Sequence, residues 1–311
     1  MRARRGFSLL GAVWLLALIS GLSLEIALSA RYSRLAIANG FERDIACRWA
    51  EAGVAEVQAA LSERLATRRA DADASRTALR ELATVAVPSD SAMGLRFEAR
   101  LTDATSRANV NLLDATALRR VLSTAGIDDG DADAISQAIA DWRDPDALPR
   151  QRGAEAPQYL AATMPVLPQN DDFRRIATLQ RVMGMTPRNY ERVVEYLTVR
   201  GSGRINVNTA PRPVLAAIDG FDARVLARLE SLRAAGTYFG SADQLLAVMP
   251  AAERGTLGER RGDWEPRVAF ELTEIEYEVR ALDAANRPRC VQRGLLLRVG
   301  DAFMALQRET E

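Results

Sequence analysis

Residues 4–28 read RRGFSLLGAVWLLALISGLSLEIAL, and this stretch decides the fold because it joins a basic start to a long apolar run. Arginines come first, Gly6 follows them, and no charged side chain occurs from Phe7 to Leu24. About 18 residues of helix at 1.5 Å per residue span roughly 27 Å, close to the thickness of a bilayer core. The stretch therefore predicts a membrane-spanning helix, and the arginines predict that its amino end stays in the cytoplasm.

Three interpretations of this segment are open from its residues alone. A secretory signal peptide needs small residues at a cleavage site after its apolar core, and residues 27–30 (ALSA) supply them. An unprocessed signal anchor needs only the apolar run. The third interpretation rests on order, because the basic leader ends in Gly6 and the apolar run starts at Phe7, before any small-residue site.

The composition excludes several classes of function. The 41 arginines are matched by 41 acidic residues and there is no lysine, so no overall positive charge favours nucleic acid. The absence of histidine excludes imidazole-bound zinc and the catalytic triads or dyads that need an imidazole. Without a glycine-rich phosphate loop either, we do not expect an enzyme. Cys47 and Cys290 have no metal-type spacing, and whether they pair is open.

Hydrophobic periodicity predicts a long helix followed by a mixed domain. Apolar residues recur at helical spacing between residues 31 and 69, and the polar stretch from Asp71 to Ser91 predicts a loop. Alternation predicts strands at Gly94–Leu101, Phe270–Ala281 and Cys290–Val299, the last two joined by a turn at Asp283–Pro288. Helical patterns fill the interval between the first two strands: Asp114–Thr124, Ala132–Trp142, Phe173–Leu197, Pro213–Ile218, Ala223–Ala234 and Ser241–Val248.

A sequence repeat lies within this helical interval. Residues 108–111 (ANVN) and 205–208 (INVN) each precede a helix, a hairpin and a second helix, about 97 residues apart, with Asp114 and Thr209 as expected N-caps. Helix–hairpin–helix units can bind DNA phosphates through exposed backbone amides. Here the first hairpin carries Asp128 and Asp129 and the second carries Asp222, and carboxylates repel phosphate. We therefore expect packing units that bind no nucleic acid.

An acidic loop follows the first repeat. Asp141, Asp144, Asp146 and Glu155 offer oxygen ligands of the kind that calcium prefers, so they are a candidate structural calcium site. The alternative is that Arg143, Arg150 and Arg152 pair with these acids. No other cofactor is expected.

The start of the chain resembles a type IV prepilin leader, which is cut after the glycine and methylated on the next residue. By this resemblance Gly6 and Phe7 flank the processing site. Gly11 then stands at the fifth mature position, where most pilins have a glutamate that K-class pseudopilins lack. The resemblance implies that the apolar helix remains as the membrane anchor, formed by Phe7, Leu9, Leu10, Gly11, Val13, Leu15, Leu16, Leu18, Ile19 and Leu22.

The rest of the chain resembles general secretion pathway protein K, a minor pseudopilin family of type II secretion systems. The similar runs occur in the same order along the chain: Leu101–Asn111, Ala140–Asp146, Gly153–Glu155, Pro168–Asn170 and Ile205–Pro211. The resemblance implies an α+β fold, in which a type IV pilin-like N-terminal helix and an antiparallel sheet head carry a large inserted α-helical, helix–hairpin–helix-like domain.

The expected division of the chain has five parts: a leader (1–6), a transmembrane helix (7–30), the helix continuation with the first strand of the head (31–108), the inserted helical domain (109–262) and the closing strands (263–311). The family implies a structural subunit at the tip of the pseudopilus, in the inner membrane with most of the chain periplasmic. Its implied partners are pseudopilins of the I and J classes, other pseudopilins, the prepilin peptidase and the assembly platform. The alternative is a membrane-tethered DNA-binding protein of the competence type.

Overall fold

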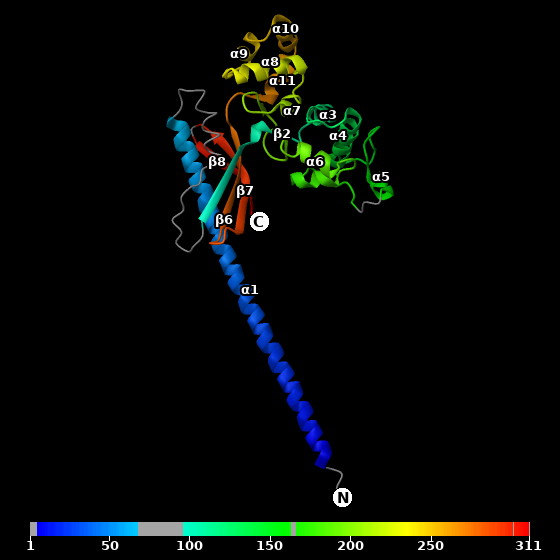
Figure 1. Cartoon of the computed structure of the whole chain (residues 1–311), viewed down its shortest axis with the longest axis vertical. Helices are drawn as coiled ribbons and strands as arrows, with labels where there is room; N and C mark the ends of the chain where they lie inside the picture. The colour runs from blue at the N-terminus through cyan, green and yellow to red at the C-terminus, as the bar shows by residue number, and fades with distance from the viewer. Residues whose placement is uncertain (1–4, 68–95, 163–165, 301, 311) are drawn as a thin grey trace.

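A long helix, a sheet and a helical insertion make up the computed structural model, which describes residues 5–67, 96–162, 166–300 and 302–310. Helix α1 (Arg5–Thr67) is continuous, and its later half packs against the sheet while its first half extends away (Figure 1). The predicted loop Asp71–Ser91, the first two residues of the predicted strand (Gly94 and Leu95) and leader residues 1–4 lie outside the described residues.

Four antiparallel strands form the sheet, in the order β1-β6-β7-β8. They are β1 (Arg96–Asp103), β6 (Glu274–Leu282), β7 (Pro288–Val299) and β8 (Ala302–Thr310). The first strand pairs with β6 along its whole length, from Arg96 opposite Leu282 to Asp103 opposite Ile275. Everything between these two strands is therefore an insertion, and the predicted α+β fold class is confirmed.

The head core lies between α1 and one face of the sheet. Helical spacing aligns Ala46, Ala50, Val54, Val57 and Leu61 on one side of α1, and all five are buried. They meet the inward side chains of the strands, which alternate along each strand because successive residues point to opposite faces: Phe97, Ala99, Leu101, Ile275, Tyr277 and Val279. Small residues on the helix allow α1 to lie close to the sheet.

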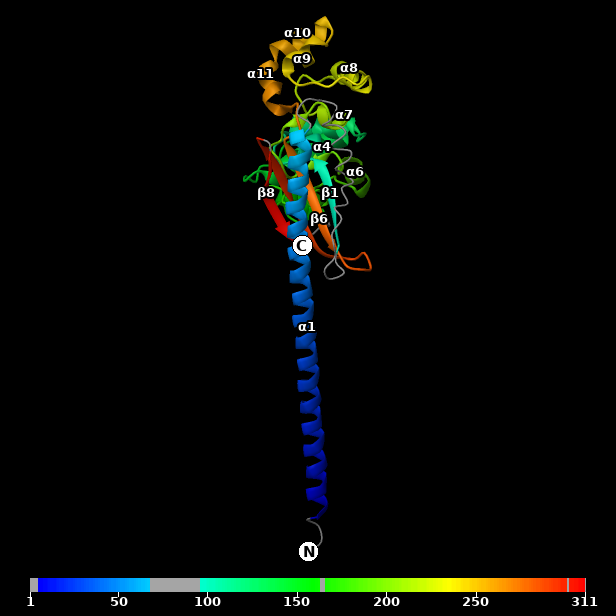
Figure 2. The same ribbon diagram turned by 90° about the vertical axis from the view of Figure 1, so that its left-hand side faces the viewer.

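The insertion has a hydrophobic core of its own, separate from that of the head. Its first part lies on the side of the sheet opposite α1, and its second part lies beyond the end of the sheet (Figures 1 and 2). Its elements in chain order are η1 (Ala104–Ser106), β2 (Ala108–Asn109), α3 (Ala115–Thr124), α4 (Asp129–Arg143), α5 (Ala156–Ala161), η2 (Ile176–Arg181), α6 (Pro187–Val193), β3 (Leu197–Thr198), β4 (Ile205–Asn206), α7 (Arg212–Leu215), α8 (Ala223–Ala234), α9 (Ala242–Ala247), α10 (Ala251–Glu259), α11 (Arg261–Trp264), η3 (Glu265–Arg267) and β5 (Val268–Ala269).

The sequence repeat is also a structural repeat. Each copy opens with a two-residue strand that pairs in parallel with a later one, β2 with β3 and β4 with β5. In the first copy the Asn111 amide exchanges two hydrogen bonds with the backbone of Phe173, at 2.9 and 3.0 Å. In the second copy Asn208 does the same with Phe239, at 2.9 and 2.8 Å. The second asparagine of each motif therefore fastens a distant loop to the start of its unit.

Two local predictions are wrong. The expected helix Phe173–Leu197 is broken into η2 and α6, because Gly184 has a φ of +82° and Thr186 caps a new helix that has Pro187 in its first turn. The expected N-cap Thr209 does not cap α7, which begins after Pro211. The Thr209 hydroxyl donates instead to the Asp103 carboxylate at 2.6 Å.

Asp103 fastens the insertion where it leaves the sheet. This buried carboxylate ends β1 and accepts hydrogen bonds from the Thr105 backbone N–H at 2.9 Å and from the Thr209 hydroxyl. At the return point, Glu274 begins β6 and accepts the backbone N–H of Ser202 at 2.8 Å. Burial raises the pKa of Asp103, while these hydrogen bonds oppose the rise because they stabilise the charged form.

A disulfide joins the helix to the sheet. Cys47 of α1 and Cys290 of β7 are bonded, with their Cα atoms 5.1 Å apart. The sequence left this pairing open because the two residues are 243 positions apart. The bond closes a loop that contains both the first strand and the whole insertion.

Removing this disulfide is expected to weaken the attachment of α1 to the sheet. We expect the Cys47→Ser/Cys290→Ser double variant to lose about 2–4 kcal/mol of unfolding free energy, because the crosslink restricts the unfolded chain. Thermal unfolding of the full chain in detergent, with and without dithiothreitol, measures the effect. The reductant should lower the melting temperature of the wild type and leave the double variant unchanged; an equal response of both would contradict the bond.

The close approach of α1 to the sheet can be tested at Gly53. A Cβ there would lie 2.9 Å from Val279 Cγ1 and 3.0 Å from the Phe97 ring, so Gly53→Leu is expected to cost about 1–3 kcal/mol by overpacking. Gly40 lies on the same helix with no atom within 4 Å of its Cβ position. Gly40→Leu is the matched control and should leave the melting temperature equal or higher, since it removes a helical glycine.

Candidate functional site

The first half of α1 has the exposure of a membrane anchor. Within the described residues, α1 is the one helix with a segment long and apolar enough to cross a bilayer, and the rest of the chain buries none of that segment. The predicted anchor residues whose side chains are described are 50–65% exposed: Val13, Leu15, Leu16, Leu18, Ile19 and Leu22. Apolar side chains in such a row are stable when lipid or other helices cover them.

The predicted processing site lies at the amino end of the same helix. Gly6 and Phe7 belong to the first turns of α1, and so do the predicted anchor residues Leu9, Leu10 and Gly11. The side chains of these five residues lie outside the described part of the structure. Processing between Gly6 and Phe7 therefore stays a prediction.

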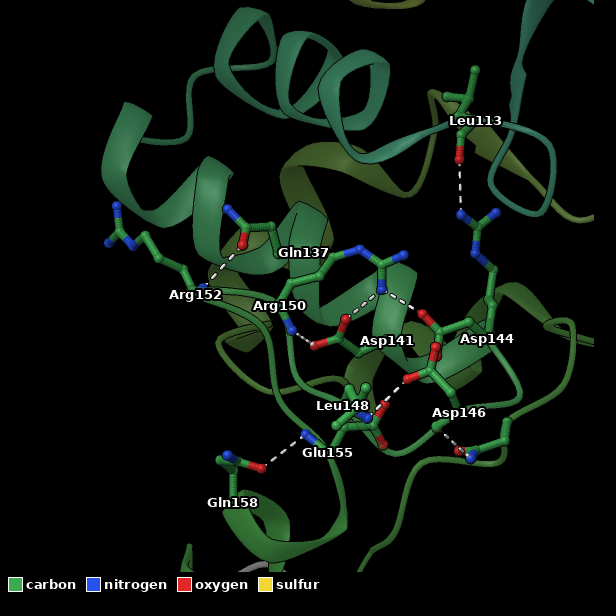
Figure 3. A network of polar contacts seen from close by, with 12 residues as sticks. Leu113, Gln137, Asp141, Asp144, Asp146, Leu148, Arg150, Arg152, Glu155 and Gln158 are labelled. Carbon is green, nitrogen blue, oxygen red and sulfur yellow. Dashed lines mark hydrogen bonds and ion pairs between the residues drawn. The ribbon is translucent and has the colours of Figure 1, made fainter.

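The acidic loop after α4 brings three of its four predicted ligands together. Asp144, Asp146 and Glu155 place carboxylate oxygens within 4.8 Å of one another (Figure 3). The C-terminus of α4 positions Asp144, the following turn positions Asp146, and Glu155 precedes α5. In that turn the Asp146 carboxylate accepts the Leu148 backbone N–H at 2.8 Å. These three acids are the candidate metal centre.

The fourth predicted ligand, Asp141, is occupied by an arginine. Its buried carboxylate forms an ion pair with Arg150 and also accepts the Arg150 backbone N–H at 3.1 Å (Figure 3). Arg150 contacts the Asp144 carboxylate as well. Arg143 donates to the carbonyls of Val110 and Leu113, and Arg152 pairs with Asp133 at 3.5 Å. Of the three arginines expected to neutralise the loop, only Arg150 therefore contacts its acids.

Two buried oxygens of the cluster have no hydrogen-bond partner, Asp144 Oδ1 and Glu155 Oε1. The Glu155 side chain is almost fully buried. Burial raises the pKa of Glu155, and the carboxylates of Asp141, Asp144 and Asp146 raise it further. A buried carboxylate among other acids is destabilising unless a cation balances it, so the donor set fits a hard divalent ion such as calcium.

The role of Gly153 could not be predicted from the sequence. A Cβ at this position would overlap the Asp141 carboxylate, so only glycine lets the loop close over the Asp141–Arg150 pair. The backbone N–H of Gly153 bonds the Arg150 carbonyl at 3.0 Å, which completes a tight turn just before Glu155. This turn holds Glu155 beside the end of α4.

The helix–hairpin–helix units retain acidic hairpins. Asp129 of the first hairpin pairs with Arg119 at 2.5 Å, and Asp219 beside the second lies near Arg120 at 3.6 Å. These two arginines beside the hairpins are therefore engaged with carboxylates, which makes them less available to a phosphate.

Comparison with known proteins identifies the relatives of the chain. A family model for protein K of the type II secretion system matches residues 99–202, which run from within β1 through the first repeat. The resemblance to the protein K family is confirmed. The matched segment contains the acidic loop, and the matched family and its relatives are secretion proteins, so the DNA-binding alternative gains no support.

Two relatives and one solved structure show the extent of the similarity. Protein K of Pseudomonas aeruginosa is 29% identical over 140 residues, 42% of either chain, and a putative protein K of Escherichia coli K12 is 35% identical over 88 residues, 28% of this chain and 27% of its own. The chain thus covers less than half the length of these relatives in the alignments. A chain of the GspK–GspI–GspJ complex from enterotoxigenic Escherichia coli has a TM-score of 0.61 at 18% identity, with 87% of this chain and 97% of that chain covered. This likeness shows that the fold is shared.

Calcium is expected to stabilise the acidic loop. In full chain held in detergent, calcium at about 100 times its dissociation constant should raise the unfolding free energy by about 2.7 kcal/mol. Without calcium, the contribution of Glu155 to the unfolding free energy should fall as the pH rises above about 4.3, because the raised pKa of Glu155 favours the protonated carboxyl in the folded state. Calorimetry at several pH values measures both effects.

Glu155→Gln removes the buried charge and should abolish the calcium response together with the part of the pH dependence that Glu155 contributes. Asp133→Asn is the matched control, since Asp133 lies on α4 outside the cluster and pairs with Arg119 and Arg152. The control should respond to calcium as the wild type does. An equal melting temperature of the wild type with calcium and with a chelator would refute the site.

Proposed function

We propose that the chain is a minor pseudopilin of a type II secretion system, a structural subunit that initiates or caps the pseudopilus for protein export. The observation that carries the proposal is the order of parts in one chain. A basic start and Gly6 precede an exposed apolar helix, a sheet packs on the later half of that helix, and a segment that matches the protein K family follows. A structural role needs no catalytic group.

The anchor supports an inner-membrane location with the head and insertion in the periplasm. The arginines before the apolar run favour a cytoplasmic amino end, which leaves the rest of the chain on the other side. The disulfide between Cys47 and Cys290 supports the same orientation, because such bonds persist in an oxidising compartment.

Gly11 supports a place at the tip of the filament. A carboxylate at membrane depth is costly unless a neighbouring subunit neutralises it, and a subunit with no neighbour above it has no use for the group. The solved structure of the same fold is a complex with GspI and GspJ. We therefore propose pseudopilins of the I and J classes as partners, with the prepilin peptidase and the assembly platform acting before them.

Assembly would move the apolar half of α1 from lipid into a bundle of similar helices. Small residues along it, such as Ala12, Ala17 and Gly21, permit close helix contacts, which drive association where no water is present. Calcium in the acidic loop would act elsewhere, by holding the first repeat of the insertion in one shape.

Processing of the leader tests this assignment. Coexpression with a prepilin peptidase is expected to shorten the chain so that it starts at Phe7 and carries an N-methyl group. Gly6→Ala should leave the leader attached because the peptidase needs the glycine before its cleaved bond. Gly21→Ala, in the same helix with open space around its Cβ position, is the control and should be processed normally. Intact mass and the terminal peptide, measured by mass spectrometry, give the result; a soluble product that starts near Ser29 would contradict the proposal.

A further inference from the structure

A cleft of about 670 Å³ lies between the outer face of the sheet and the first repeat of the insertion. Its floor comes from strands β1, β6, β7 and β8, and its other wall comes from η2 and from residues 194–200, which follow α6 and include β3. The volume is in the range of sites that bind small molecules or short peptide segments. Neither the anchor nor the acidic loop contributes to it.

Each carboxylate that lines the cleft already has a partner. Glu276 pairs with Arg107 at 3.2 Å, Glu278 with Arg293 at 2.7 Å, and Glu309 with Arg200 at 2.7 Å. The fourth acid, Glu195, accepts a hydrogen bond from the Tyr196 hydroxyl. The cleft therefore has no carboxylate left over for a cationic ligand.

Arg100, on the floor of the cleft, has no such partner among the residues that the structure describes. Its side chain is exposed, and within the described part of the chain it has no ion pair or side-chain hydrogen bond. Glu278 stands opposite Arg100 on the next strand, but Arg280 and Arg293 hold that carboxylate. A guanidinium in this position presents five donors with no acceptor, which suits a carboxylate.

The wall that faces Arg100 adds an apolar component. Ile176, Ala177, Val194 and Val199 line this side of the cleft. A site with one open cation on a polar floor and an aliphatic wall fits a ligand that has a carboxylate next to an apolar side chain. A free inorganic anion would leave the aliphatic wall without a contact.

We propose that this cleft binds an acidic peptide segment, with a carboxylate on Arg100 and an aliphatic side chain on the wall formed by η2 and residues 194–200. The charged lining residues of the sheet lie on the face opposite α1 and therefore apart from the helix that would pack in the filament.

Fluorescence anisotropy with the full chain in detergent tests the site. The probe is a fluorescein-labelled peptide of alternating leucine and aspartate, and its twin has asparagine in place of aspartate. We expect the acidic peptide to bind at least about tenfold more tightly than the twin, as a charge-assisted hydrogen bond implies. Arg100→Gln should remove this preference, and Ala177→Trp should block both peptides by filling the cleft.

Arg96→Gln is the matched control, since Arg96 precedes Arg100 on the same face of β1 and does not line the cleft. It should leave binding unchanged. Equal loss of binding in both arginine variants, or no binding of the acidic peptide at millimolar concentration, would overturn the proposal. Full competition by inorganic phosphate would also overturn it, by showing a simple anion site.

Discussion

The burial of one face of α1 against the sheet is the contact on which the rest of the structure depends. Ala46, Ala50 and Gly53 allow the helix to lie close to the sheet. The inward side chains of all four strands then pack against α1 in a single core. The outer face is then left polar, and Arg100, Glu278, Arg293 and Glu309 form a row of alternating charge across the four strands. The insertion therefore contacts this face of the sheet through ion pairs, and its apolar core is separate from the core of the head.

The position of the insertion follows from strand pairing. Because β1 and β6 are antiparallel neighbours, the end of one lies beside the start of the other, and a long insertion can join them without disturbing the sheet. Asp103 and Glu274 occupy these two points, where both are buried. Buried carboxylates are tolerated here because they accept hydrogen bonds from the insertion. The bond from Thr209 to Asp103 fixes the second repeat to the head, and the bond from Ser202 to Glu274 fixes the segment just before it.

Patterns of local origin could be predicted from the sequence, and contacts between distant segments could not. Periodicity located α1 and three strands of the head, and the repeated Asn-Val-Asn motif located both helical units. The break at Gly184 could not be predicted because the apolar spacing continues through it. The last strand, β8, could not be predicted because apolar and polar residues do not alternate regularly along it. The Cys47–Cys290 bond and the Asp141–Arg150 pair depend on which segments meet in space, which spacing along the chain does not determine.

Ion pairing decides which charged groups remain available for ligands. Arginine and acid are equal in number, and with no lysine or histidine nearly every pairing is between a guanidinium and a carboxylate. Where Arg150 takes Asp141, the nearby Glu155 keeps a buried oxygen without a partner, and the loop has excess negative charge. Because Arg280 and Arg293 form ion pairs with Glu278, Arg100 has no carboxylate partner within the described residues, and the cleft has excess positive charge. A chain of zero net charge thus presents two sites of opposite sign, one suited to a cation and one to a carboxylate.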